Sequence, residues 1–310
     1  MLINPEVETD TNISWICDGC GAMLNVQDGF SEDCGEWKCT ECGHVNSIDI
    51  SELYLSEDEY QASLRNPYKG LSDEDVLALS LYQEEQFVGD RDDVAIVRKS
   101  DSGDFYIKKL LTTYDKSVYE YLVEHPIAHM PRIHEIYESD NCLIVIEEYI
   151  KGRTVEDMLS EGPLSEADAV DITMATCDIL HDLHNLPTPV IHRDIKPSNI
   201  MVTEDHTVYL LDMNVAKWYD PDKNDDTRYL GTEYYAAPEQ VGYGMSSSSP
   251  KTDIYAMGIL LNVMLTGSYP KEVRASEKYW HIIERCISLD AGNRYTAAEL
   301  KAKLDRITGG

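Results

Sequence analysis

Two C-x-x-C pairs near the start of the chain constrain its folding more than any other feature. The first pair is Cys17 and Cys20, the second is Cys39 and Cys42, and 18 residues separate them. This spacing is typical of a four-cysteine zinc site. Each pair presents two thiolates on one side of a tight turn, and two such turns complete a tetrahedron around Zn²⁺. The sequence therefore predicts a structural zinc ion, because four thiolates leave no open position for water.

The residues around the second pair strengthen this prediction. The stretch 37–46, WKCTECGHVN, resembles the second knuckle of zinc-ribbon modules. The resemblance implies a small β module over about the first 50 residues. Cys34 is expected to be a spare thiol and His44 a loop histidine. Redox-active or unliganded thiols are the alternative, and the task of the module stays open between packing and binding a partner or substrate.

The chain is strongly and unevenly acidic. It carries 57 acidic and 26 basic side chains, a formal net charge of −31. Residues 1–93 hold 22 acids and four bases, or −18, which is more than half of the excess. This balance argues against nucleic-acid partners and anionic membranes, since both require Lys and Arg. The acidic front end suits either the attraction of basic substrates or a solvated, extended connector.

Composition divides the chain into three regions. We expect a zinc ribbon over 1–50, an acidic connector with a short helix over 51–84, and a globular domain over 85–306. Ser72 followed by three acids is typical of a helix start. Residues 94–98 and 104–110 flank a turn-rich tetrad and predict a β-hairpin. Apolar periodicity and composition predict helices over 115–123, 165–185, 252–266, 279–289 and 296–306. The fold class is α+β.

Targeting signals are not expected. The first ten residues are acidic and lack the apolar core of a signal peptide. The longest apolar run, 256–265, is about half the length of a membrane-spanning helix. We therefore expect a soluble, cytoplasmic protein without membrane contact, and make no prediction of oligomeric state.

The decisive string for function is HRDIKPSN at positions 192–199. It resembles the catalytic loop of eukaryotic-like serine/threonine protein kinases almost letter for letter. The resemblance implies that Asp194 orients the substrate hydroxyl and accepts its proton. Lys196 would neutralise charge on the transferred phosphoryl group, and Asn199 would hold a magnesium ion.

Further matches to this family follow in the expected order. Asp212, in LLDMN, stands where the family bridges Mg²⁺ to the phosphates, and Asn214 takes a position where glycine is usual and φ is often positive. Ala237-Pro238-Glu239 resembles the end of a kinase activation segment. Asp253 is expected to brace the catalytic loop, and Arg294 to pair with Glu239.

The nucleotide-binding half matches the family less closely. Lys108 is favoured as the ATP-anchoring lysine because strand alternation separates it from Phe105 and Ile107, while Lys109 is its competitor. Its helical partner is expected to be Glu120, with Glu124 as the alternative. The hinge is expected over Glu148, Tyr149 and Ile150. If Val94 closes the glycine-rich loop, then of its three glycine positions (Phe87, Gly89 and Asp92) only Gly89 keeps glycine.

The resemblance covers residues 85–306 and is strongest to the compact bacterial type. It implies a bilobal fold with a β-rich first lobe and a helical second lobe, and an enzyme that uses ATP and Mg²⁺ to phosphorylate Ser or Thr in protein substrates. The degenerate glycine loop, with Asp92 and Asp93, keeps open a pseudokinase that binds nucleotide or acts as a scaffold. A small-molecule phosphotransferase is a third alternative. Arg193 before Asp194 suggests control by phosphorylation at Thr227, or at Tyr229.

Overall fold

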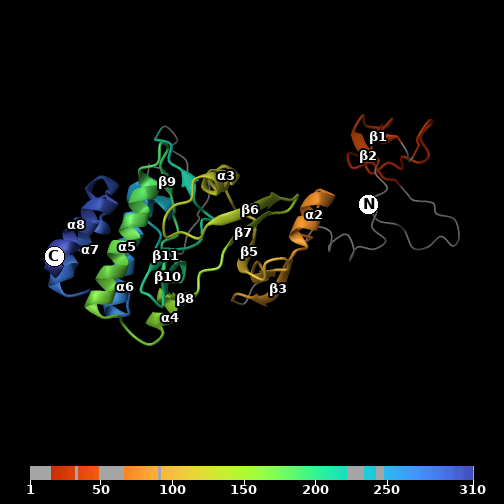
Figure 1. The fold of residues 1–310 in the computed structure, drawn as a ribbon. Coiled ribbons are helices and arrows are strands. Elements are labelled where there is room, and N and C mark those ends of the chain that lie inside the picture. The colour runs from red at the N-terminus through yellow and green to blue at the C-terminus, as the bar shows by residue number, and fades with distance from the viewer. Residues whose placement is uncertain are drawn as a thin grey trace. The chain divides into compact units, whose positions relative to one another are not determined.

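The computed structural model describes residues 15–31, 34–48, 66–89, 92–221, 234–241 and 248–309. The chain divides into two compact units, Met1–Gly70 and Leu71–Gly310. Figure 1 shows the element order along the chain. The acidic helix predicted after Ser72 belongs to the second unit, since its first helical residue is Asp73.

The first unit is built on a short antiparallel hairpin. Its strands are β1 (Gly35–Lys38) and β2 (Val45–Ile48), and an isolated bridge joins Ile16 to Met23. Its buried residues are few: Trp15, Cys17, Leu24, Cys39 and Ile48. A core of this size rarely stabilises a fold without a further link. The unit therefore has the size and the cysteine content of a small metal-stabilised module, as the sequence predicts.

The second unit begins with a helix and a five-stranded antiparallel sheet. In α2 (Asp73–Leu79) the Ser72 side chain accepts from the Asp75 amide, which confirms the predicted N-cap. The strand order in the sheet is β3-β4-β5-β7-β6. The strands are β3 (Tyr82–Phe87), β4 (Val94–Lys99), β5 (Phe105–Leu111), β6 (Ile133–Glu138) and β7 (Leu143–Glu148). The predicted hairpin is confirmed as β4 and β5, with helix α3 (Lys116–Glu124) after it.

The register of this sheet determines which residues share a face. Lys109 lies opposite Val94 on one side and Val145 on the other, whereas Lys108 lies opposite Ala95 and Ile146. Because successive side chains in a strand point to opposite faces, the two lysines project from opposite sides of the sheet. The two lysines therefore cannot face the same site.

The rest of the second unit is mainly helical, and short strands carry the loops of the site. The helices are α4 (Val155–Leu159), α5 (Glu166–His184), α6 (Pro250–Thr266), α7 (Glu277–Cys286) and α8 (Ala297–Thr308), with 3-10 turns η2 (Pro197–Asn199), η3 (Pro238–Val241) and η4 (Ala291–Asn293). The short strands are β8 (Gly152–Thr154), β9 (Val190–Ile191), β10 (Ile200–Thr203), β11 (Val208–Leu210) and β12 (Lys217–Trp218).

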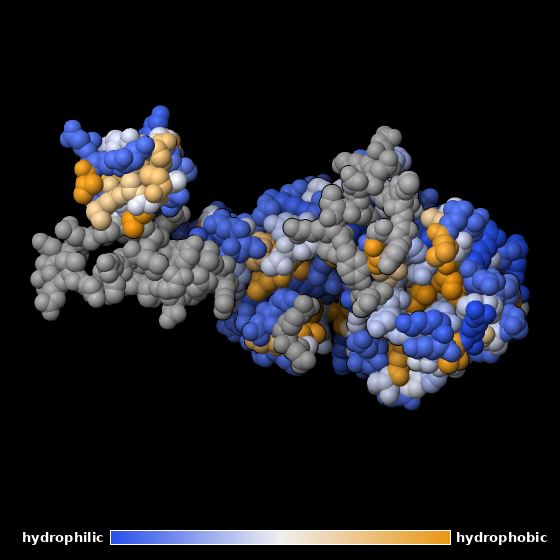
Figure 2. Space-filling model, turned by 180° about the vertical axis from the view of Figure 1, so that it is seen from behind, coloured by the Kyte–Doolittle hydropathy of each residue, from blue (hydrophilic) through white to orange (hydrophobic). Residues whose placement is uncertain are grey.

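Helix α6 is the centre of the helical lobe. Twelve of its 17 residues are buried, and Gly258 lets it approach α7 closely, since a Cβ there would lie 2.5 Å from the Cβ of Cys286. In Figure 1, α5, α6, α7 and α8 lie together at the end of the unit away from the five-stranded sheet. Figure 2 shows a mostly hydrophilic surface with small separate hydrophobic areas. The predicted β-rich lobe followed by a helical lobe is confirmed.

Candidate active site

The loop at 192–199 is held by a buried carboxylate from α6. The Oδ2 of Asp253 accepts from the His192 amide at 3.0 Å and its Oδ1 from the Arg193 amide at 2.8 Å. His184 lies 2.8 Å from the same carboxylate. Burial opposes ionisation, but these hydrogen bonds outweigh it and lower the pKa of Asp253. The predicted brace is confirmed, whereas the part of His184, at the end of α5, carried no signal in the sequence.

Within this loop, Asp194 is the focus of two neighbouring side chains. The Asn199 amide donates to the Asp194 main-chain oxygen at 2.9 Å and to its Oδ2 at 3.0 Å. The Lys196 ammonium lies 2.7 Å from the same Oδ2. The structure therefore brings together all three residues that the sequence singles out as catalytic. Because the nitrogen of Asn199 faces Asp194, its amide oxygen points away from that residue.

Asp212 is joined to this loop through the residue that precedes it. The Leu211 amide donates to the Asn199 carbonyl at 2.8 Å, and the ring of His192 lies 3.0 Å from the Leu211 carbonyl. These two contacts tie the end of β11 to the catalytic loop. The main-chain hydrogen bond between Leu211 and Asn199 therefore helps to fix the position of Asp212 relative to Asn199.

The backbone is strained at two points of the site. Asp212 has a φ of 67° and Arg193 a φ of 70°, in the left-handed region that non-glycine residues rarely adopt. Such backbone strain is found most often at functional sites. Asn214 is not among the residues with positive φ, so that expectation is wrong; its side chain instead accepts from the hydroxyl of Tyr119 at 3.3 Å.

The lysine that faces Asp212 is Lys109. Its ammonium lies 2.7 Å from Oε1 of Glu147 and 3.9 Å from Oδ1 of Asp212, and its side chain is 8% exposed. Burial opposes its charge, but the carboxylates of Glu147 and Asp212 outweigh burial and raise the pKa of Lys109. Lys108 points to the other face of the sheet, where it pairs with Glu84. The alternation used to favour Lys108 is present, but the face that meets Asp212 is the one carrying Phe105, Ile107 and Lys109.

The expected ion pair with a glutamate of helix α3 is also not formed. The side chain of Glu120 is 56% exposed and lies 3.6 Å from Lys116, one turn earlier on the same helix. The alternative, Glu124, is exposed as well. The buried residues of α3 are Val118, Tyr119 and Leu122. The predicted pairing of Lys108 with Glu120 is therefore corrected: neither residue faces the site, because the inward face of α3 is apolar and aromatic.

The expected nucleotide-binding segments lie around this lysine. Val94 begins β4 opposite Lys109, and Gly89 has a φ of 77° in the turn between β3 and β4. Strand β7 ends at Glu148, whose main-chain amide donates to the Arg132 carbonyl at 2.8 Å, and Ile150 beyond it is buried. Their contacts with a nucleotide remain predictions.

The end of the activation segment is fixed to the helical lobe. Arg294 makes a two-pronged ion pair with Glu239, at 2.6 and 2.9 Å, and its side chain is fully buried. This confirms the predicted structural pair. The Gln240 amide donates to the Arg193 carbonyl at 2.9 Å, which joins this segment to the catalytic loop. The candidate phosphorylation sites Thr227 and Tyr229 lie outside the described residues.

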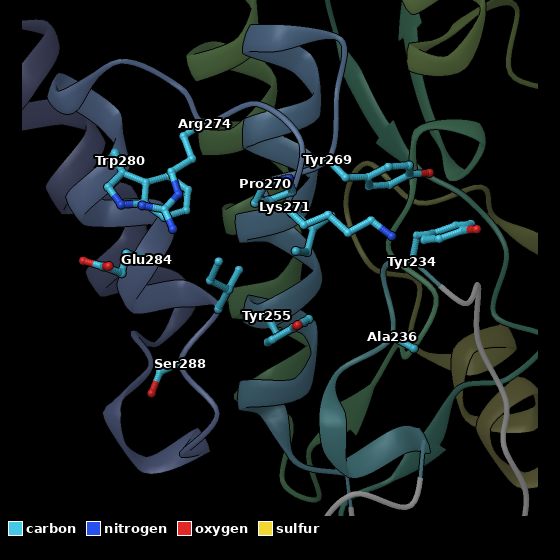
Figure 3. Close-up of a pocket in the computed structure, with 12 residues that line it drawn as sticks. Tyr234, Ala236, Tyr255, Tyr269, Pro270, Lys271, Arg274, Trp280, Glu284 and Ser288 are labelled. Carbon is cyan, nitrogen blue, oxygen red and sulfur yellow. The ribbon is translucent and has the colours of Figure 1, made fainter.

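A cleft of about 690 Å³ opens beside this segment, between it, α6 and α7. The Lys271 ammonium lies 4.7 Å from the ring centre of Tyr234, and the Arg274 guanidinium 4.5 Å from that of Trp280. Figure 3 shows Lys271 extending toward Tyr234 and Tyr269, with Arg274 beside Trp280 on the opposite wall. Among the described residues, neither cation has an acidic partner within ion-pair distance. The cleft is therefore lined by aromatic rings and by two cations, with one acid, Glu284, on the α7 side.

The four cysteines of the first unit converge as the sequence predicts. Their Sγ atoms all lie within 4.8 Å of one another, with Cys17 to Cys42 at 3.5 Å and Cys20 to Cys39 at 3.8 Å. A zinc tetrahedron with Zn–S bonds of about 2.3 Å has S···S edges of about 3.8 Å, so the arrangement fits this ion.

Two amide side chains support these sulfurs. The Gln27 amide donates to Cys39 Sγ at 3.3 Å, and the Asn46 amide lies 3.6 Å from Cys17 Sγ. The hydrogen bond from Gln27 lowers the pKa of Cys39 to about 6. A lowered pKa favours the thiolate that binds metal. Sequence reasoning missed both amides, because Gln27 and Asn46 lie outside the C-x-x-C pattern.

Comparison with known proteins matches the second unit to a large family. The family model described as "Protein kinase domain" matches residues 94–304. The chain is 31% identical over 184 residues to striated muscle preferentially expressed protein kinase of Danio rerio, covering 56% of this chain and 6% of that protein. It is 32% identical over 150 residues to serine/threonine-protein kinase kin-29 of Caenorhabditis briggsae, covering 48% and 18%.

A bacterial relative is similar to the same region. Serine/threonine-protein kinase PknB of Mycobacterium tuberculosis is 29% identical over 194 residues, covering 54% of this chain and 30% of that protein. The chain thus spans less than a third of the length of each of these relatives. Separately, no helix among the described residues is long and apolar enough to cross a membrane.

Proposed function

Since the chain belongs to the protein kinase family, we propose that it transfers the γ-phosphoryl group of ATP to Ser or Thr hydroxyls of protein substrates. The names of the relatives kin-29 and PknB favour Ser and Thr as acceptors. We assign the kinase domain to residues 85–306, the zinc ribbon to residues 1–50, and the acidic connector to the residues between them.

Asp194 is proposed as the group that orients the acceptor hydroxyl and takes its proton. Its Oδ2 accepts from the Asn199 amide and lies against the Lys196 ammonium, and these two contacts orient the carboxylate. A positioned base contributes about 10²- to 10⁴-fold to a rate. Lys196 is also placed to offset negative charge that moves onto the transferred group.

Asp212 and Asn199 are the proposed magnesium ligands. A carboxylate and an amide oxygen are donors that suit Mg²⁺, and both residues are tied to the same loop by the bond from the Leu211 amide to the Asn199 carbonyl. When bound, Mg²⁺ would neutralise charge on the phosphates. Lys109 is the proposed nucleotide-anchoring lysine, because it is the lysine that lies near Asp212.

One observation carries the proposal: two main-chain amides of the loop that bears Asp194 are fixed by the buried carboxylate of Asp253. Preorganised groups lower the barrier without reorganising during the reaction. A domain that only binds partners gains nothing from holding this loop in a strained backbone conformation. The competent geometry of Asp194, Lys196 and Asn199 therefore favours an enzyme over a scaffold.

The cleft of Figure 3 bears on the substrate. The acidic front end of the chain suggests basic substrates, whereas Lys271 and Arg274 suit an acidic segment close to the activation segment. We propose that substrates carry acidic residues away from the phosphorylated hydroxyl and that basic residues meet the acidic front end. Salt weakens both attractions, since they act between exposed charges.

The test of the proposed function is phosphate transfer from radiolabelled ATP. Casein serves as an acidic acceptor and histone as a basic one, with autophosphorylation measured alongside. The full-length chain should label at least one acceptor on Ser or Thr, and Asp194→Asn should not. Equal labelling by both proteins would refute the proposal, and no labelling by either would favour the nucleotide-binding scaffold.

A further inference from the structure

Helix α3 presents no carboxylate to the lysine of the site. Glu120 and Glu124 are both exposed, and Glu120 pairs with Lys116 on its own helix. Tyr119 of α3 lines a small cavity together with Glu147 and Asp212, and it is 1% exposed. Burial, together with the charges of Asp212 and Glu147, raises the pKa of Tyr119 well above its ordinary value. Its hydroxyl stays protonated and donates to Asn214.

The carboxylate that meets Lys109 comes from the sheet instead. Glu147 lies on β7 opposite Ile107, two residues before Lys109 on the neighbouring strand, so it approaches Lys109 diagonally across the strand pair. Its Oε1 lies 2.7 Å from the Lys109 ammonium, and the two side chains are 10% and 8% exposed. Hydrogen-bonded strands hold both residues, so their spacing does not depend on α3.

The surroundings of Glu147 give it no other described cation. It lines a small cavity of about 20 Å³ with Tyr119, Asp212 and Met213, and with apolar residues of the segment before β6. A buried carboxylate in apolar surroundings is costly unless it is paired. Lys109 is that pair, and the same ammonium also faces Asp212 at 3.9 Å.

We infer that Glu147 is the positioning residue of the nucleotide-anchoring lysine, and that it replaces a glutamate of helix α3 in this role. This inference rests on the proposed function. It makes the lysine part of a rigid sheet, so movement of α3 does not make or break its ion pair. Helix α3 is then connected to the site through the hydroxyl of Tyr119 and the side chain of Asn214.

The test compares two glutamates by their kinetics with ATP. Glu147→Gln keeps the shape and removes the charge, while Glu120→Gln is the matched control on α3. With the full-length chain, Glu147→Gln should lower kcat/KM for ATP by about 100-fold, the order expected when a reacting group is misplaced. Glu120→Gln should stay within about twofold of wild type. The opposite ranking, or no effect of Glu147→Gln, overturns the inference.

A third variant separates positioning from packing. Glu147→Asp keeps the charge and leaves a cavity, whereas Glu147→Gln fills the space without charge. If Glu147 positions Lys109, Asp should retain more activity than Gln but less than wild type, because it keeps the charge and has a shorter reach; if Glu147 only fills space, Gln should retain more, and the inference fails. Should Glu147→Gln not fold, kcat/KM of Glu147→Asp decides: a fall of about tenfold or more with Glu120→Gln unchanged supports the inference, and wild-type values overturn it.

Asp194→Asn, measured in the same series, keeps the two proposals apart. If wild type transfers phosphate, Asp194→Asn does not, and Glu147→Gln equals wild type, only the inference about Glu147 falls. If Asp194→Asn transfers as well as wild type, the proposed function falls.

Discussion

The catalytic loop and the nucleotide-binding sheet of this kinase domain are organised in different ways. The loop is fixed by main-chain hydrogen bonds to Asp253, and its functional side chains lie within eight consecutive residues. In the sheet, the charged pair joins Lys109 and Glu147, which are 38 positions apart in the chain and lie on neighbouring strands. The loop therefore tolerates little change in sequence, whereas the sheet allows the lysine's partner to come from another element.

Substitutions in the two regions should therefore have different effects. Substitution of a loop residue removes either a proposed catalytic side chain or a contact that supports the strained backbone. Loss of a group in the sheet misplaces a lysine that is otherwise well buried.

The first prediction concerns the base itself. Asp194→Asn removes the charge that we propose takes the hydroxyl proton, so kcat should fall by about 10³-fold, within the range for a lost general base. The affinity for ATP should change by less than about twofold, because the proposed contact of Asp194 is with the acceptor hydroxyl and not with the nucleotide. Equilibrium binding of a fluorescent ATP analogue measures the second value. A variant that loses binding along with transfer would contradict the assignment.

The second prediction concerns the support of the loop. Asp253→Asn leaves the His192 and Arg193 amides facing a weaker acceptor and an added donor, so the free energy of unfolding should fall by about 3 kcal/mol. The pKa of Asp253 is lowered in the folded state. Its stabilisation is therefore full above the ordinary Asp pKa of about 3.9 and is lost as pH falls through the lower folded value.

Urea unfolding at several pH values measures both effects. Wild type should lose stability more steeply than Asp253→Asn below about pH 4, because only wild type has this carboxylate to protonate. Parallel curves for the two proteins would show that the charge of Asp253 does not support the loop.

The third prediction concerns the effect of metal removal on the tertiary structure of the two units. The first unit has a small core and four converging thiols, while the second has an extensive core. A strong chelator should abolish the tertiary structure of the first unit, and two cysteine-to-serine changes at Cys39 and Cys42 should do the same. The change is measured by the fluorescence of Trp15 and Trp37, in a variant whose other two tryptophans are replaced. Unfolding of the kinase domain under the same conditions would contradict the separation of the units.

The fourth and smallest effect concerns substrate choice. Reversing two cations with Lys271→Glu and Arg274→Glu should raise KM for an acidic acceptor such as casein by about fivefold, since each exposed pair contributes little. The kcat should not change, and the KM for a basic peptide should stay level or fall. Added salt should reduce the difference between wild type and the double variant. A change in kcat with KM unaltered would place the cleft outside substrate binding.

Sequence reasoning predicted these two halves to different degrees. Local pattern or a long motif predicted the hairpin of β4 and β5, every α-helix except α4, the brace from Asp253 and the pair of Glu239 with Arg294. The choice between Lys108 and Lys109 does not, because alternation says that two residues face opposite ways but not which way is inward. That direction is set by tertiary packing, which places Lys109 and not Lys108 near Asp212.

Glu147 was missed for a related reason. The apolar composition of LIVIEE indicates a buried strand, but it does not indicate which residue a glutamate of that strand contacts. Only the diagonal contact between neighbouring strands shows that it faces a buried lysine. His184, Gln27 and Asn46 were missed likewise, since each acts through a partner far away in the sequence.

The most direct test of the account is a matched pair of substitutions at two adjacent lysines. Lys109→Ala and Lys108→Ala are compared by kcat/KM for ATP in the full-length chain. The account predicts a loss of about 100-fold or more for Lys109→Ala, because it is the lysine held at Asp212, and a change within about threefold for Lys108→Ala. A larger loss for Lys108→Ala, or equal activity in both variants, would contradict it.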